Sequence, residues 1–214
     1  MTHPTTDSLP RIAFIGGGNM ARSLVGGLVA RGVPPGRIGV AEPQAALRSA
    51  LAGDFGIAVH EAGTEATANA DLWVLATKPQ VMREVCTGLA AQASASRPLV
   101  VSIAAGITVD QIDRWLGGGQ AIVRSMPNTP ALLGAGVTGL HANPRVDAAG
   151  RDAAQALLGA VGHTVWIEDE ALMDAVTAVS GSGPAYFFLL AEAMQAAAEA
   201  QGLPPAAARD LVLH

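Results

Sequence analysis

The pattern of hydrophobic and polar positions alternates between short apolar runs and longer stretches in which apolar residues recur every three or four positions. Six apolar runs are typical of strands: residues 12–15, 37–41, 57–59, 72–76, 99–103 and 121–124. Helical spacing falls between them, at residues 21–30, 44–52, 80–91 and 109–116. Strands that alternate with helices predict an α/β fold, a Rossmann-type and mostly parallel sheet with helices on both faces.

The pattern changes towards the end of the chain and becomes mainly helical. Residues 147–160 and 172–179 have helical spacing, with a short strand at 164–167 and a turn at 180–184. The stretch 185–200 is apolar on nearly every face, so we expect it to be buried in a larger assembly. This organisation predicts a flexible tail over residues 1–10, a nucleotide-binding domain over 11–168 and a helical domain over 169–214.

A glycine-rich turn follows the first predicted strand and precedes the first predicted helix. Its sequence, Gly16-Gly17-Gly18-Asn19-Met20-Ala21, has the G-x-G-x-x-A spacing of a dinucleotide-binding fingerprint. Gly16 permits a sharp turn, and Gly18 has no side chain to keep a pyrophosphate from the backbone. The helix N-terminus favours the negative charge of that group. The turn therefore predicts a dinucleotide site.

Small or rigid turns follow the other predicted strands, and ligands of such sheets bind at the carboxyl ends of the strands. Candidate residues there are Glu42, Thr77, Lys78, Pro79, Ala104, Ala105, Gly106 and Asn128. Glu42 is either an acceptor for ribose hydroxyls or a solvated acid at a helix start. Lys78, the only lysine, is either a cation near the cofactor or an ordinary surface residue.

Composition and charge exclude several other classes of function. The net charge is −5 with no basic block, which argues against nucleic acid and anionic membranes as partners, and no apolar run is long enough to span a bilayer. The first ten residues have no basic region typical of a signal peptide. The single cysteine, Cys86, rules out an internal disulfide and indicates a reducing cytoplasm. The scattered histidines predict no metal site.

Five motifs in order resemble those of pyrroline-5-carboxylate reductases. They are the glycine turn 16–20, Lys78-Pro79-Gln80, Ser102-Ile103-Ala104-Ala105-Gly106, Met126-Pro127-Asn128-Thr129-Pro130 and Ser180-Gly181-Ser182-Gly183-Pro184-Ala185-Tyr186. The resemblance runs from about Arg11 to the last residue. It implies reduction of 1-pyrroline-5-carboxylate to L-proline with NADPH or NADH. It also implies a Rossmann domain followed by a helical domain that makes an intertwined homodimer, from which larger rings are often built.

The resemblance assigns roles to individual residues. Gly16, Gly17, Gly18, Asn19 and Met20 would bind the pyrophosphate, and Thr77, Lys78 and Pro79 the adenosine and ribose side. Ala104, Ala105 and Gly106 would lie near the nicotinamide, with Asn128 beside it. The substrate residues would be Glu170, Ser180, Gly181, Ser182 and Gly183. A carboxylate such as Glu170 would favour a protonated imine.

Three features depart from the family pattern. Gly63 stands where many relatives have a nucleotide-contacting asparagine, and Glu42 stands where NADPH-preferring members carry a small polar residue. The chain also stops at His214, before the helices and the substrate-gripping loop that relatives add, so we expect self-association and slow turnover of these 214 residues alone. Another imine or β-hydroxyacid-type reductase, and a dinucleotide-binding fragment without turnover, are the competing hypotheses.

Overall fold

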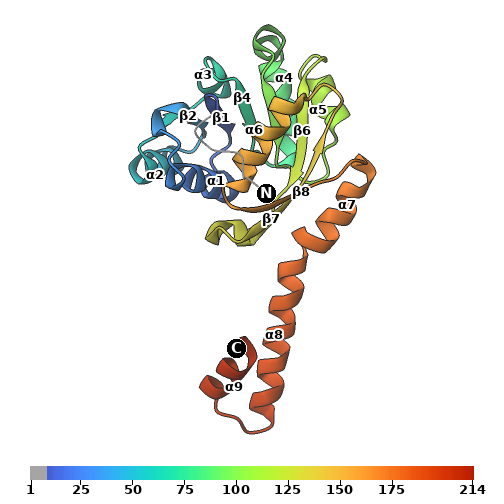
Figure 1. Cartoon of the computed structure of the whole chain (residues 1–214). Helices are drawn as coiled ribbons and strands as arrows, with labels where there is room; N and C mark the ends of the chain where they lie inside the picture. The colour runs from blue at the N-terminus through green and yellow to red at the C-terminus, as the bar shows by residue number, and fades with distance from the viewer. Residues whose placement is uncertain (1–8) are drawn as a thin grey trace.

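The computed structural model describes residues 9–214, which form an α/β domain with a helical arm projecting from it (Figure 1). Residues 1–8 of the predicted flexible tail lie outside the described residues. At Leu9 the tail prediction is wrong, because this side chain is buried in the core at 2% exposure.

The strands and helices of the described residues are bounded as follows. The strands are β1 Ile12–Ile15, β2 Ile38–Ala41, β3 Ala58–His60, β4 Leu72–Leu75, β5 Leu99–Ser102, β6 Ala121–Met126, β7 Gly136–Ala142 and β8 Gly162–Trp166. The α-helices are α1 Asn19–Ala30, α2 Ala45–Phe55, α3 Gly63–Thr67, α4 Pro79–Ser96, α5 Val109–Trp115, α6 Ala148–Gly159, α7 Met173–Val176, α8 Gly183–Ala200 and α9 Pro205–Leu213. Short 3₁₀ segments are η2 Pro35–Arg37, η3 Thr129–Leu133 and η4 Glu170–Leu172, and η5 Thr177–Gly181 is a π-helical turn.

One sheet contains the eight strands in the order β3-β2-β1-β4-β5-β6-β7-β8. All neighbouring pairs are parallel except β6 and β7, which run antiparallel with Met126 opposite Gly139. The predicted Rossmann-type fold and its six apolar strands are confirmed. The order reverses between β1 and β4, which creates the switch point at which such sheets bind ligands.

The sheet is covered on both faces, which explains why its central strands are continuously apolar. Ile12 and Phe14 belong to one buried cluster together with residues of α1, α2 and α6. Ala13 and Ile15 point to the opposite cluster, which includes residues of α4 and α5. The side chains of β1 alternate between the two clusters, so the glycine turn follows the carboxyl end of a strand that is packed on both faces.

The predicted turn at residues 180–184 is wrong over most of its length, because within it only Ser182 lies outside η5 and α8. The Ser182 N–H donates to the Thr177 carbonyl at 2.8 Å, which makes a π-turn that leads directly into α8. A Cβ on Gly181 would lie 2.8 Å from the Met126 Cε, so glycine allows the turn to pack closely against the end of β6. In the sequence these glycines indicate a loop, whereas in the structure Gly181 permits a close contact.

The helical arm consists of α8 and α9, which contact each other and extend away from the sheet (Figure 1). Helix α9 lies within residues 169–214, which were predicted to be helical, although its bounds were not predicted. Within this single chain α8 leaves large apolar side chains exposed: Tyr186, Phe187, Phe188, Leu189, Leu190 and Met194. Such a continuous apolar surface is typical of an interaction site.

Candidate active site

The glycine turn between β1 and α1 has the geometry that a nucleotide site requires. Gly16 has φ of +104°, and a Cβ there would lie 2.6 Å from the Ala76 carbonyl oxygen, so no other residue fits. Gly18 is exposed and extended at the N-cap of α1, without a side chain that caps the helix. A Cβ on Gly18 would meet no protein atom within 4 Å. The open N-terminus of α1 is thus accessible to an anionic group.

A cavity of about 250 Å³ lies in front of this turn. Its lining brings together predicted residues from three strand ends: Gly18, Asn19, Met20, Thr77, Lys78, Pro79, Ala104 and Ala105. Lys78 is exposed at the N-cap of α4, beside the cavity that the glycine turn borders. The carboxyl ends of β1, β4 and β5 therefore converge on one hollow, as the sequence predicted.

A larger cavity of about 470 Å³ lies on the other side of Gly16, between the ends of β1, β2 and β4 and the start of α4. Apolar residues line much of it, including Val81, Val85 and Leu89, while Glu61 and Glu84 also border it. Thr77 lines both cavities. This arrangement fits an elongated ligand that has an anionic centre and a flat ring at one end that can lie against apolar side chains. A dinucleotide has this shape.

Glu42 is buried at 6% exposure, so its interpretation as a solvated acid is wrong. One carboxylate oxygen accepts from the Gly17 N–H at 2.9 Å, and the other accepts from the Gln44 N–H at 2.9 Å. A Cβ on Gly17 would lie 3.1 Å from the Glu42 Cβ, so glycine also admits this side chain beside the turn. Glu42 therefore builds the nucleotide turn as well as ending β2.

Arg48 hydrogen-bonds to the backbone at Glu42 and Pro43, directly after β2. Its Nη1 donates to the carbonyls of Glu42 and Pro43, each at 2.7 Å, and its Nη2 lies 3.2 Å from a Glu61 carboxylate oxygen. These bonds direct the guanidinium to the backbone after β2. The sequence placed Arg48 only near Glu42, and its bond to Glu61 depends on the pairing of β2 with β3.

Asn128 is buried and connects two segments instead of lining either cavity. Its Nδ2 donates to the Ser180 carbonyl at 3.0 Å, and its Oδ1 accepts from the Val137 N–H at 2.9 Å. Ser180 directs its own hydroxyl to the Val176 carbonyl. Gly106, Ser180, Gly181, Ser182 and Gly183 are likewise absent from the linings of both cavities. The contacts predicted for these residues with nicotinamide or substrate stay predictions.

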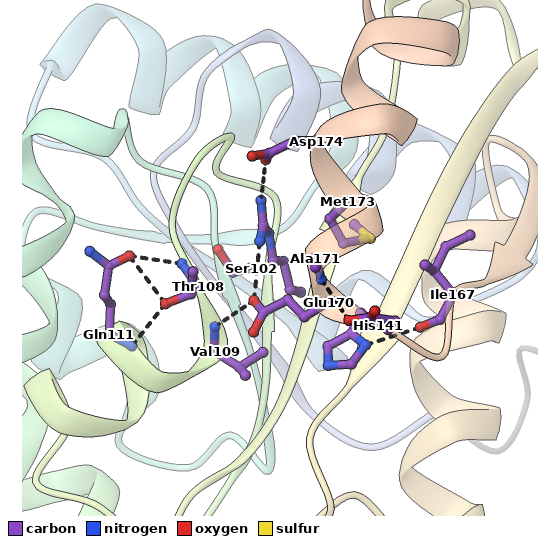
Figure 2. Close-up of polar contacts among 12 residues, drawn as sticks. Ser102, Thr108, Val109, Gln111, His141, Ile167, Glu170, Ala171, Met173 and Asp174 are labelled. Carbon is purple, nitrogen blue, oxygen red and sulfur yellow. Dashed lines mark hydrogen bonds and ion pairs between the residues drawn. The ribbon is translucent and has the colours of Figure 1, made fainter.

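Glu170 lies at the start of η4, where it joins three elements (Figure 2). Its Oε1 accepts from the Val109 N–H at 2.9 Å and from Arg124 Nη1 at 3.1 Å. Arg124 also approaches Asp174, with 3.2 Å between Nη2 and Oδ1. Sequence reasoning missed Arg124, although an arginine inside an otherwise apolar strand was an available signal.

Cys86 has no feature of a nucleophile. It is fully buried in α4, and burial raises the pKa of its thiol to about 12, so the thiol stays protonated at neutral pH. Within residues 9–214, none of the helices has the length and apolar character needed to cross a bilayer. Over the same residues, histidine, cysteine and acidic side chains form no group of three that would hold a metal ion.

Two protein families match parts of the chain. Residues 11–106 match the family described as NADP oxidoreductase coenzyme F420-dependent. Residues 170–214 match the family described as pyrroline-5-carboxylate reductase dimerisation. The first match contains the glycine turn and the carboxyl ends of β1, β2, β4 and β5, and the second contains the helical arm.

Full-length relatives are similar over nearly the whole chain. Pyrroline-5-carboxylate reductase of Pseudomonas aeruginosa is 54% identical over 207 residues, which cover 97% of this chain and 76% of that protein. A solved pyrroline-5-carboxylate reductase structure from Coxiella burnetii superimposes with a TM-score of 0.92 at 41% identity, over 96% of this chain and 76% of the other. The Plasmodium falciparum pyrroline carboxylate reductase, solved with NADP bound, gives a TM-score of 0.83 at 26% identity, over 95% and 74% of the two chains.

Proposed function

The chain belongs to the pyrroline-5-carboxylate reductase family, and we propose that it reduces 1-pyrroline-5-carboxylate to L-proline with NADH or NADPH, the last step of proline biosynthesis. The observation that carries this function is the 54% identity to a reductase over 97% of the chain. The glycine turn and the two cavities at the switch point support it independently, because they fit the cofactor that the reaction needs.

The cofactor supplies a hydride to the imine carbon when it is bound, and a proton from solvent or substrate completes the amine. We assign the pyrophosphate to Gly16, Gly17, Gly18, Asn19 and Met20, because the uncapped N-terminus of α1 opens there. Lys78 adds a positive charge beside the same cavity. The cavity near Glu61 and Val85 is assigned to the adenosine end.

The nicotinamide end is assigned to the turn between β5 and α5, which carries Ala104, Ala105 and Gly106. Ala104 and Ala105 line the same cavity as the glycine turn, and their small side chains allow a flat ring to approach the backbone. The protein's main contribution is then to fix the ring and the imine relative to each other. Asn128 and the segment Ser180, Gly181, Ser182 and Gly183 border the substrate region in this proposal.

The buried carboxylate of Glu42 favours NADH over NADPH. It lies at the end of β2, where the carboxylate can accept a hydrogen bond from a ribose 2′-hydroxyl but repels a 2′-phosphate. Glu61 and Glu84 border the adjoining cavity and add to the negative potential.

The helical arm is proposed to pair with a second copy of the chain, giving a homodimer or a larger homo-oligomer. The match of residues 170–214 to a dimerisation family and the exposed apolar side chains of α8 support this assembly. A cytoplasmic location belongs to the same proposal. It is supported by the single protonated thiol of Cys86 and by the need for reduced dinucleotide.

A substrate panel tests the function. Oxidation of NADH or NADPH is followed with 1-pyrroline-5-carboxylate and with another cyclic imine, and reduction of NAD⁺ or NADP⁺ is followed with a β-hydroxyacid. We expect oxidation with 1-pyrroline-5-carboxylate to exceed turnover of the others by at least about ten-fold in kcat/KM. Preference for another substrate would assign a different reductase. Cofactor binding without any turnover would leave a dinucleotide-binding protein.

A further inference from the structure

We propose that Glu170 is a positioning residue that fixes the nicotinamide turn, residues 103–108, from the helical part of the chain. This inference rests on the proposed function only for the identity of the cofactor and substrate. Its basis is the bond between Glu170 Oε1 and the Val109 N–H, which joins residues 61 positions apart in the sequence (Figure 2).

Val109 is the residue at which the turn ends and α5 begins. Thr108 before it forms a reciprocal cap with Gln111, in which the Thr108 N–H donates to Gln111 Oε1 at 2.9 Å. That cap satisfies N–H groups at Thr108 and Gln111 and leaves the Val109 N–H without an intrahelical acceptor. Glu170 supplies this acceptor, so the first backbone donor of α5, directly after the turn, is held by a side chain from η4.

Arg124 holds the Glu170 carboxylate in place. Its side chain is 6% exposed, it lies opposite Ser102 in the register of β5 and β6, and its Nη1 is 3.1 Å from Glu170 Oε1. Asp174, its other partner, is 87% exposed, so water screens that pair. Glu170, whose side chain is 22% exposed, is therefore the principal counter-charge of a buried guanidinium.

A substitution that keeps the acceptor can separate this role from direct action on the substrate. The Oε1 atom accepts two hydrogen bonds, one from the Val109 N–H and one from Arg124. A glutamine at position 170 retains a carbonyl oxygen for Val109 and Arg124 but has no charge. A residue that stabilises a protonated imine needs the charge, whereas a residue that holds the turn needs chiefly the acceptor.

The experiment compares Glu170→Gln and Glu170→Ala with the parent protein. We expect Glu170→Ala to lower kcat for 1-pyrroline-5-carboxylate by about ten- to a hundred-fold with little change in KM, since misplaced reactants react slowly. Glu170→Gln should stay within about three-fold of the parent kcat, with an unchanged pH profile. Asp174→Asn, which removes the exposed partner of Arg124, is the matched control and should behave as the parent.

Two further measurements do not depend on turnover. Glu170→Ala should weaken binding of NADH by about five-fold or more while binding of ADP-ribose, which lacks nicotinamide, stays within about two-fold. Val109→Pro deletes the same N–H at a helix position that accepts proline, and Thr108 before it is already extended. It should reproduce the loss of NADH affinity, and combining it with Glu170→Ala should add little.

Several results would overturn the inference. Equal losses of kcat in the glutamine and alanine variants, with a shifted pH profile, would assign Glu170 to the substrate. Parallel weakening of NADH and ADP-ribose, or a lower melting temperature alone with unchanged kcat and unchanged affinities, would make it a general structural residue. Absence of 1-pyrroline-5-carboxylate turnover in the parent would instead contradict the proposed function, while the comparison of NADH with ADP-ribose would still decide the role of Glu170.

Discussion

The carboxylate of Glu42 accepts a hydrogen bond from the Gly17 N–H at 2.9 Å, which joins the end of β2 to the middle of the glycine turn. The residue proposed to select the cofactor therefore also shapes the loop that binds its pyrophosphate. A substitution at Glu42 changes both charge and loop geometry, and a useful test has to separate the two.

We predict that the parent protein binds NADH about ten-fold more tightly than NADPH. A like-charge contact with a 2′-phosphate costs on the order of 1–2 kcal/mol, and Glu42→Ser should abolish most of that difference. Glu42→Gln keeps an acceptor for the Gly17 N–H but loses the charge and the acceptor for the Gln44 N–H, so it should shift the preference with less effect on NADH than Glu42→Ser has. Glu168→Gln, at an exposed acid that lines neither cavity, is the control. A parent that strongly prefers NADPH would contradict the assignment.

Gly18→Val is predicted to weaken dinucleotide binding without unfolding the protein. The new side chain projects into open space in front of α1, where the pyrophosphate would lie, so Kd for NADH should rise by at least about ten-fold. The melting temperature should change by only a few degrees, as for Gly53→Val, an exposed helical control that also meets no neighbour. Unchanged affinity in a folded Gly18→Val variant would remove the glycine turn from the site.

Gly16→Val should behave differently, because its Cβ would overlap the Ala76 carbonyl in a left-handed backbone conformation. We expect a loss of stability of more than about 2 kcal/mol, measured as a lower midpoint of urea unfolding. A Gly16→Val variant as stable as the parent would show that this close approach of β1 and β4 is not required.

Apolar residues of α8 are predicted to hold two copies together. Phe187 and Leu190 lie one helical turn apart and are 74% and 57% exposed in the single chain. Replacing both with aspartate should convert the parent oligomer to monomers in sedimentation or light-scattering measurements, with helical content retained. Glu192→Ala on the same helix should leave the assembly intact. A parent that is monomeric at every concentration would contradict the proposed interface.

Cys86 should be unreactive in the native protein and reactive after unfolding. Burial raises its folded-state pKa from 9.0 to about 12, so the unfolded chain releases the thiol proton at lower pH than the folded protein does. Its contribution to stability is therefore complete below about pH 9 and declines as the pH rises towards 12. Unfolding free energies measured over this range should fall more steeply for the parent than for Cys86→Ala. Equal slopes, or rapid native labelling by a thiol reagent at pH 8, would contradict this prediction.

The sequence was sufficient for the elements whose local pattern matches their burial. The run at residues 72–76 predicts β4 because both faces of this strand are covered, and the glycine spacing at Gly16 and Gly18 locates the nucleotide turn. Strand β7 was missed because tertiary contacts, and not an apolar strand pattern, determine which residues it contains. A Cβ on Gly139 would lie 2.6 Å from Val176, so the strand carries glycine where a strand pattern expects an apolar side chain.

The candidate site was predictable to the extent that it lies in local turns. The bonds from Glu42 to Gly17 and from Glu170 to Val109 join residues 25 and 61 positions apart, and no local pattern specifies such pairs. They follow from the strand order and from the position of η4 beside α5 and β6. Sequence reasoning therefore identified both glutamates as notable but did not identify their partners.

The most direct measurement is the fate of the transferred hydride. With NADH or NADPH deuterated at nicotinamide C4 on the transferred face, turnover of 1-pyrroline-5-carboxylate by this protein should give L-proline with one deuterium at C5, the former imine carbon, and one oxidised cofactor per proline. Mass spectrometry and NMR of the product read both quantities. Proline without deuterium, or cofactor oxidation with no proline formed, would contradict imine reduction by this protein.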